Sequence, residues 1–231
     1  MHELVPVILQ GDYGRLIGHG IQWTLALTFS AWLLAMAMAL LLITLRLREG
    51  RWGARLVAAY VSYHRNIPTL VQLMVWYFAI PAALPPRLQI WLGHYNTELL
   101  FACIALGLCQ GAYFSEDIRS GIRAVAPGQV EAARTLGLTY LGALRHVILP
   151  QAIRHAMPAL INNSVLLFKN TSLAMTIGLA ELTYATREVE SESFRTFQCF
   201  ALATALYLLG ALLLMLGGDW LSRRFRLVTE R

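Results

Sequence analysis

The chain has 231 residues, of which 57% are hydrophobic and only 14% are charged, and its mean hydropathy is +0.55. Soluble globular domains carry roughly 25% charged residues, so this composition excludes an ordinary soluble protein and indicates a membrane protein. The formal net charge of +6 would suit a nucleic-acid-binding protein, but the arginines are distributed among the loops between apolar segments. Membrane topology explains that distribution better, and we expect one transmembrane domain over residues 1–231.

Five apolar segments are candidates for membrane spans. A transmembrane helix needs about 20 mostly apolar residues, because each adds about 1.5 Å towards a hydrocarbon core roughly 30 Å thick. The candidates are residues 21–45, 68–84, 99–115, 156–179 and 196–217, of which the second and third are short. The sequence therefore predicts an all-α integral membrane protein with five spans. The first residues, MHELVPVILQGDYGRL, lack the features of a removable signal peptide, and we expect none.

The arginines indicate the orientation of the chain. Five lie in the loop after the first span, five in the loop after the third and four in the C-terminal tail. The N-terminal segment and the other two loops share only Arg15, Arg87, Arg187 and Arg195. Because basic residues are retained on the cytoplasmic side, the N-terminus is predicted outside and the C-terminus inside.

The loop after the fourth span is acidic and lies outside in this topology. Its glutamates are Glu181, Glu188, Glu190 and Glu192. An outer face that docks a soluble partner and a merely solvated loop explain them equally well.

The inner loop over approximately residues 116–155 is too long for a simple connector. Pro127 and Gly128 break the chain, and the helix formers that follow end at Gly137, a natural C-terminal cap. Thr139 is placed to cap a second helix that ends before Pro150. Its apolar residues recur at spacings of three and four, at Leu141, Leu144, Val147 and Ile148. Two short helices with a bend suit a groove on another protein, or the surface of the inner leaflet.

The residues of this loop resemble a cytoplasmic signature of permease subunits of binding-protein-dependent ABC importers. That signature is Glu-Ala-Ala, three residues, Gly, nine residues, Ile, any residue and Leu-Pro. The matching residues here are Glu131, Ala132, Ala133, Gly137, Val147, Leu149 and Pro150, with Val147 in place of isoleucine. The segments RNIPTLVQLMVWYF, GAYFSEDIRSGI and LLFKNTSLAMTIGLAELT are similar to the polar amino acid branch of the family, and closest to its glutamate/aspartate type.

The resemblance implies a transport subunit that moves polar amino acids across the bacterial inner membrane by alternating access. The seven signature residues would form the coupling helix region that contacts a separate ATPase dimer. Glu131 would pair with a basic residue of the ATPase, Ala132 and Ala133 would allow close approach, and Gly137 would supply the bend. The further partners implied are a second permease subunit, identical or homologous, and an extracytoplasmic amino acid-binding protein.

We expect no cofactor on this chain and no enzymatic activity. A phosphate-binding loop ends in Gly-Lys-Ser/Thr, whereas the only lysine, Lys169, lies between Phe168 and Asn170. ATP and Mg²⁺ would therefore bind the partner ATPase. The six histidines form no His-Glu-x-x-His motif and no His/Cys cluster, so we expect no metal site.

Lys169 lies inside the predicted fourth span. Pro158 suits a first helical position, and eleven residues at about 1.5 Å each place Lys169 roughly 16 Å deep. A charge there costs on the order of 3 kcal/mol unless it faces a polar cavity or a partner. Asn170, Thr171 and Ser172 follow and favour local unwinding or interhelical hydrogen bonds. We interpret these four residues as cargo contacts; the alternative is that Lys169 neutralises an acidic residue or binds backbone carbonyls.

Gln72, Gln110 and Tyr113 are weaker candidates for the transport path, and each is also suited to an interhelical hydrogen bond. Three other functions stay open from the residues. They are import of another polar or basic amino acid, a self-sufficient secondary transporter with Lys169 in an ion-coupled site, and a membrane anchor for a cytoplasmic complex.

Overall fold

A computed structural model describes residues 11–47 and 51–224, and every regular element within them is helical. The α-helices are α1 (Gly11–Leu47), α2 (Arg51–Asn66), α3 (Thr69–Met74), α4 (Ile80–Ala83), α5 (Pro86–Leu92), α6 (Thr97–Arg123), α7 (Pro127–Thr135), α8 (Tyr140–Ala143), α9 (Leu149–Asn170), α10 (Leu182–Ser193) and α11 (Thr196–Arg224). Val75–Ala79 and Leu144–Ile148 are π-helical, and Thr171–Ile177 is a 3₁₀ helix. The prediction on a signal peptide concerns mainly residues 1–10, which lie outside the described ranges, as do Arg48, Arg226 and Arg231.

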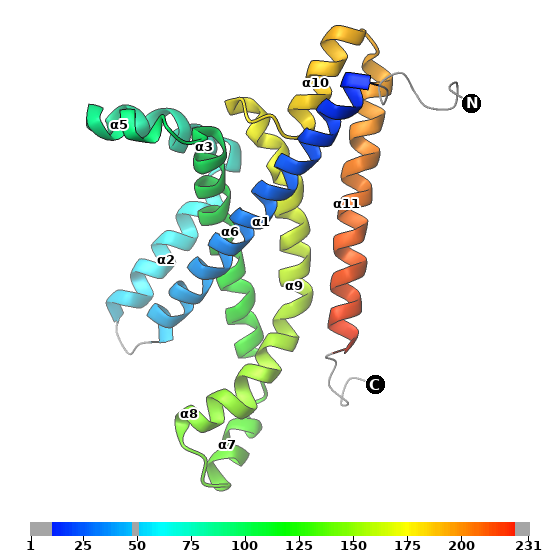
Figure 1. The fold of residues 1–231 in the computed structure, drawn as a ribbon. Coiled ribbons are helices and arrows are strands. Elements are labelled where there is room, and N and C mark those ends of the chain that lie inside the picture. The colour runs from blue at the N-terminus through cyan, green and yellow to red at the C-terminus, as the bar shows by residue number, and fades with distance from the viewer. Residues whose placement is uncertain (1–10, 48–50, 225–231) are drawn as a thin grey trace.

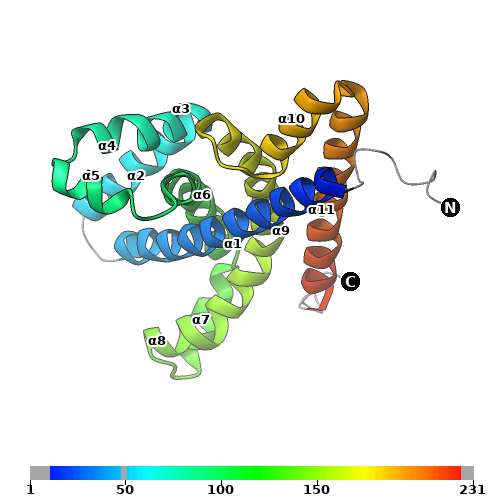
Figure 2. The same ribbon diagram turned by 45° about the horizontal axis from the view of Figure 1, so that its top comes forward.

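Helix α6 is the centre of the bundle. The apolar part of α6 is 56% buried, against 17% for α11. Helices α1 and α9 both pack against α6, and α11 packs against α9 (Figures 1 and 2). Figure 1 places α7 and α8 at one end of the molecule and α5 and α10 at the other.

Small residues bring α1 and α6 close together. Ala31, Ala35 and Ala39 recur every four residues along α1 and are fully buried. A side chain added at Gly107 of α6 would meet Leu34, and one at Gly111 would meet Met38 and Ala35. In a bilayer the lipid tails are as apolar as the helices, so close packing of this kind holds the helices together in place of the hydrophobic effect.

Hydrogen bonds link the same helices at a few positions. The Trp32 indole of α1 donates to Ser164 Oγ of α9 at 3.0 Å. The Gln110 amide of α6 donates to the Asn163 carbonyl of α9 at 3.0 Å. Such bonds contribute on the order of 0.6 kcal/mol each within membranes, and they fix the register of one helix against the next.

The all-α prediction is confirmed, and three to five membrane spans fit the structure. Helices α1, α6 and α11 are each long and apolar enough to cross a membrane. Two further candidates are bent pairs, Trp52–Asn66 with Thr69–Ala83 at 104°, and Leu141–Ile177 with Leu182–Ser193 at 52°. The predicted number of five is reached if each bent pair counts as one span.

The first predicted loop contains a helix that the sequence prediction missed. Its residues form α2, where Val57 and Val61 pack on Leu42 of α1 and Ala112 of α6. The arginines and His64 lower its hydropathy below that of a span, although one face is apolar. The chain then bends before Pro68, since a proline disfavours helix at the residue before it.

The predicted inner loop of 40 residues is also largely helical. Helix α6 continues to Arg123 and includes Gly121, which packs closely against Ala152 and Ala156 of α9. The expected helix end before Pro150 is wrong. The Leu149 N–H bonds the Leu144 carbonyl in a π-helical turn, which widens the helix where the proline ring would otherwise clash with the preceding turn. Pro158 lies inside α9 and not at its first position.

The predicted outer acidic loop is instead helix α10. Leu182, Ala185 and Val189 lie on one face and pack against Ile17 of α1 and Cys199 of α11. Glu188 and Glu192 are exposed, and Glu190 accepts a hydrogen bond from Thr196 at 2.7 Å. Glu181, in contrast, is fully buried, so an unstructured solvated loop is not the right description.

Candidate functional site

The signature residues lie on a helical projection at one end of the molecule, which we name the coupling segment (residues 127–150). It comprises α7, the bend at Gly137, α8 and the π-helical turn that leads into α9 (Figure 1). Pro127 starts α7, where its missing N–H costs no hydrogen bond. The Gly142 N–H bonds Thr139 Oγ1 at 3.2 Å, so the predicted cap of the second helix is confirmed.

Gly137 makes the bend as predicted. Its φ is +80°, in the left-handed region, and its N–H bonds the Arg134 carbonyl at 2.9 Å. The Leu138 N–H bonds the Ala133 carbonyl at 3.1 Å. These two bonds form the Schellman motif that ends a helix on a glycine.

The structure divides the other signature residues between an outer and an inner face. Glu131 and Ala132 are exposed, and so are Leu149 and Pro150. Ala133 is buried against the chain itself, and Val147 is half-buried. Of the two adjacent alanines, only Ala132 is therefore free to allow close approach of another protein.

Two leucines complete the exposed face of the coupling segment. Leu136 is 81% exposed and Leu141 is 72% exposed. Leu141 belongs to the predicted apolar stripe, whereas Leu136 was not singled out. A leucine directly before a capping glycine in a polar segment is the signal that would have identified it. An apolar surface on a projecting element, rimmed by polar residues, is typical of a protein contact.

Substitution of Gly137 by alanine is expected to strain the bend. A side chain at this φ costs about 1–2 kcal/mol, although nothing lies within 4 Å of the added methyl group. Amide exchange of Leu138 should therefore accelerate about 5- to 30-fold, measured by hydrogen–deuterium exchange. The control is Gly128→Ala, which adds the same methyl group to the same segment, also without a neighbour within 4 Å but without a positive φ. Equal acceleration in both variants would contradict the role given to the bend.

Lys169 lies in the last turn of α9 and is exposed in the isolated chain. It lines a groove of about 600 Å³ between α9, α10 and α11. The polar residues of this groove are Lys169, Ser172, Thr183, Thr204 and Tyr207. Its remaining lining is apolar and follows α11 as far as Met215. The Lys169 side chain thus lines a mostly apolar groove that carries four other polar residues.

The helix type changes directly after Asn170, where the sequence predicted local unwinding or interhelical hydrogen bonds and the structure has a 3₁₀ helix with local hydrogen bonds. Thr171 and Ser172 begin a 3₁₀ helix that ends at Gly178, whose φ is +89°. The Thr171 hydroxyl donates to the Phe168 carbonyl at 2.7 Å, and the Ser172 hydroxyl donates to the Lys169 carbonyl at 2.8 Å. Asn170, at the junction, is half-buried. Ser172 joins Lys169 in the groove, whereas Thr171 is buried.

A buried carboxylate that the sequence interpretation placed in solvent lies beside this groove. Glu181 caps α10 by accepting the N–H groups of Thr183 and Tyr184, each at 2.9 Å. The Tyr207 hydroxyl donates to Glu181 Oε2 at 2.7 Å and lies 2.9 Å from the Thr183 hydroxyl. An acidic residue directly before a helical segment is a recognised capping signal, but the contact with Tyr207 spans two helices and has no local sequence signal.

Gln72 lies in α3, just after the bend between α2 and α3. Its amide nitrogen donates to the carbonyls of His64 at 3.0 Å and Ile67 at 2.8 Å. His64 Nδ1 lies 2.6 Å from Gln72 Oε1. The side chain therefore ties the bend together, in line with the hydrogen-bonding alternative.

Gln110 and Tyr113 lie on α6. Gln110 is bound to the α9 backbone, and the Arg65 guanidinium lies 5.4 Å from the centre of the Tyr113 ring. The structure does not bring Gln72, Gln110 or Tyr113 into the lining of the Lys169 groove.

Comparison with known proteins assigns the fold and the protein family. Residues 31–227 match the family described as binding-protein-dependent transport system inner membrane component. The chain is 32% identical over 218 residues to the glutamate/aspartate import permease protein GltJ of Escherichia coli, covering 91% of this chain and 87% of that protein. It is 34% identical over 209 residues to the nopaline transport system permease protein NocM of Agrobacterium fabrum, covering 88% and 86%. A crystal structure of an amino acid ABC transporter with histidines superposes with a TM-score of 0.82 at 31% identity, over 95% of this chain and 99% of that one.

Proposed function

The chain belongs to the family of binding-protein-dependent transport system inner membrane components, and we propose that it is the permease subunit of an ATP-driven importer of glutamate or aspartate. Membership of the family makes it a transport subunit of the inner membrane, related to amino acid permeases. The observation that carries the importer mechanism is the coupling segment, because it holds the signature residues on an exposed projection.

The coupling segment is proposed to dock in a groove of an ATPase. Leu136 and Leu141 supply exposed apolar contacts, and the neighbouring Glu131 supplies a charge that fixes the register. ATP and Mg²⁺ bind the ATPase pair in this proposal, and closure of that pair moves the coupling segments. Since α9 continues from the coupling segment without interruption, the movement is passed directly to the helix that carries Lys169.

The Lys169 groove is proposed as part of the cargo path. The ammonium group offers a positive charge that suits a carboxylate, which every amino acid carries. With Glu181 ionised, Tyr207 donates to Glu181, and the Thr183 hydroxyl then donates to Tyr207. The free lone pairs of Thr183 would accept an N–H of the cargo ammonium. Lys169 thus suits the carboxylate of the cargo amino acid, and Thr183 suits its ammonium group.

The choice of glutamate or aspartate rests on the relationship to GltJ and on the cationic Lys169. The relatives of similar identity include a nopaline permease and a probable glutamine permease, so another polar or basic amino acid is the second candidate. The external binding protein is proposed to set much of the specificity.

The permease is proposed to act in pairs, with this chain or a homologous one as its partner. Helix α11 leaves most of its apolar surface exposed, including Leu209 and Leu213. Five spans enclose a gated path only with a second subunit, and the predicted orientation places the coupling segment in the cytoplasm.

Reconstitution tests this function. The tagged chain is expressed with an ATPase and a binding protein from the same gene cluster, purified and placed in liposomes. Uptake of labelled glutamate should require all three components and ATP. Ion-driven uptake by the chain alone would instead establish a secondary transporter, and a complex that never contains a nucleotide-hydrolysing subunit would refute the importer proposal.

A further inference from the structure

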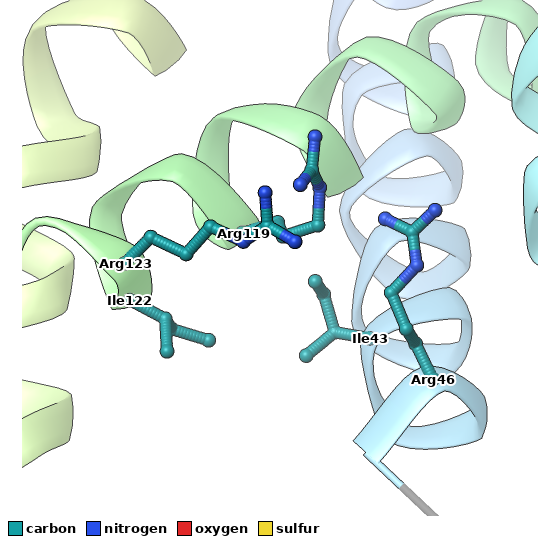
Figure 3. A pocket seen from close by; sticks show the side chains of 5 residues that line it. All are labelled: Ile43, Arg46, Arg119, Ile122 and Arg123. Atoms are coloured by element: carbon teal, nitrogen blue, oxygen red, sulfur yellow. The ribbon is translucent and has the colours of Figure 1, made fainter. Parts of the chain in front are cut away.

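Three arginines from two spans surround one cavity near the junction of α1 and α6. Arg46 lies in the last turn of α1, and Arg119 and Arg123 lie one turn apart at the end of α6. With Ile43 and Ile122 they line a cavity of about 210 Å³. Figure 3 shows the three guanidinium groups along one edge of the cavity and the two isoleucine side chains along the other. The wall of the cavity itself is apolar, so the guanidinium groups lie at its edge.

The positive charge of this arginine cluster is only partly balanced. Glu116 binds two of the three arginines: Arg46 Nη1 lies 2.6 Å from Oε1, and Arg119 Nε lies 2.8 Å from Oε2, with a second bond from Arg119 Nη2. Arg123 is exposed and takes part in none of the hydrogen bonds or ion pairs found within residues 11–47 and 51–224. One carboxylate opposite three guanidinium groups leaves two positive charges, and the single negative charge of a phosphodiester would balance one of them.

The surface beside the cluster is apolar and belongs to a span. Leu40 of α1 is exposed and lies three residues before Ile43, which lines the cavity, in a helix that is apolar enough to cross the membrane. A soluble anion would use the arginines alone. A phospholipid would use both features, with its phosphate at the guanidinium groups and an acyl chain along Leu40.

We propose that the arginine cluster binds the phosphate of an anionic phospholipid in the adjacent leaflet, with an acyl chain along Leu40 of α1. Basic pockets between transmembrane helices bind anionic headgroups by this combination of contacts. The lipid would bridge the ends of α1 and α6 and hold their charged turns together. The inference does not depend on which amino acid is transported.

Lipid counting on the assembled transporter tests this site. The complex is placed in nanodiscs of phosphatidylcholine with increasing phosphatidylglycerol, and bound phosphatidylglycerol is counted by native mass spectrometry. Arg123→Gln should weaken retention about fivefold, because one arginine near an anionic surface contributes about that factor. Arg123→Lys should retain most of the binding. Arg87→Gln, an exposed arginine of α5 at the other end of the molecule, should change nothing.

Three results would overturn the proposal. The first is an equal loss in Arg87→Gln and Arg123→Gln, which would mean unspecific attraction to the membrane. The second is displacement of the lipid by added inorganic phosphate, which would assign the cluster to a soluble anion. The third is loss of the ATPase subunit from Arg123→Gln with an unchanged lipid count, which would make the cluster a protein contact. Because the readout is lipid and not uptake, failure here leaves the transport function untouched.

Discussion

Replacement of Lys169 by methionine is expected to lower glutamate uptake at least tenfold in liposomes that contain the complete transporter. The substitution removes the only ammonium group of a side chain from the groove while keeping a long side chain there. A hydrogen bond to a charged group contributes about 1.5–3 kcal/mol, which corresponds to roughly 10- to 150-fold in binding. Assembly with the ATPase and the melting temperature should stay close to those of the wild type, because Lys169 is exposed in the chain and no ion pair found among the described residues includes it.

Two matched variants give this prediction its controls. Arg187→Met removes an exposed cation from α10, outside the groove, and should leave uptake unchanged. Lys169→Arg keeps the charge and should retain more uptake than Lys169→Met. If Lys169→Met fails to assemble, the lysine serves the structure of the bundle and the cargo contact is refuted.

The choice of substrate then shows which carboxylate Lys169 contacts. An equal loss for glutamate, glutamine and arginine would mean that the ammonium group binds the α-carboxylate common to all three. A loss confined to glutamate would mean that it binds the acidic side chain. Normal uptake of every substrate would remove Lys169 from the cargo path.

The coupling segment was predicted well because its signals are local. Pro127, Thr139 and Gly137 act on their own backbone or on a residue within a few positions, so their effects follow from sequence alone. Pro150 was the exception. Its local signal indicates a helix end, but the π-helical turn before it lets α8 continue into α9.

The outer half of the candidate site was not predictable in the same way. Lys169 was found because a charge inside an apolar segment is conspicuous in the sequence. Glu181 lies among other glutamates, and its burial depends on Tyr207, which is 26 residues away in α11. Composition therefore indicated an outer loop that is either solvated or docks a partner, whereas the tertiary contact makes this glutamate a buried cap.

The prediction of whole helices also fails where tertiary packing, and not local sequence, decides the structure. Helices α1, α6 and α11 were predicted from apolar length alone. Helix α2 was missed because its arginines lower its hydropathy, although Val57 and Val61 bury one face against two spans. A half-buried helix that carries arginines combines the composition of a loop with the packing of a core element.

Replacement of Glu131 by glutamine is expected to uncouple ATP hydrolysis from transport. Glu131 is exposed on α7, and none of the ion pairs found within the described part of the chain involves it. Its loss therefore leaves no charge unpaired inside the permease itself. At the proposed interface with the ATPase, loss of one partner of a desolvated charge pair costs about 2–5 kcal/mol, so uptake should fall at least tenfold. Hydrolysis by the ATPase should continue, but without acceleration by the loaded binding protein.

A second glutamate separates this effect from a general effect of charge. Glu192 is equally exposed but lies on α10, at the opposite end of the molecule, so Glu192→Gln should leave uptake and stimulated hydrolysis unchanged. Restoration of uptake in Glu131→Lys by an acidic substitution on the ATPase would identify the partner residue directly. If Glu131→Gln transports normally, the register of the coupling segment is set by Leu136 and Leu141 alone, and the charge pair has no part in transmitting the movement of the ATPase to α9.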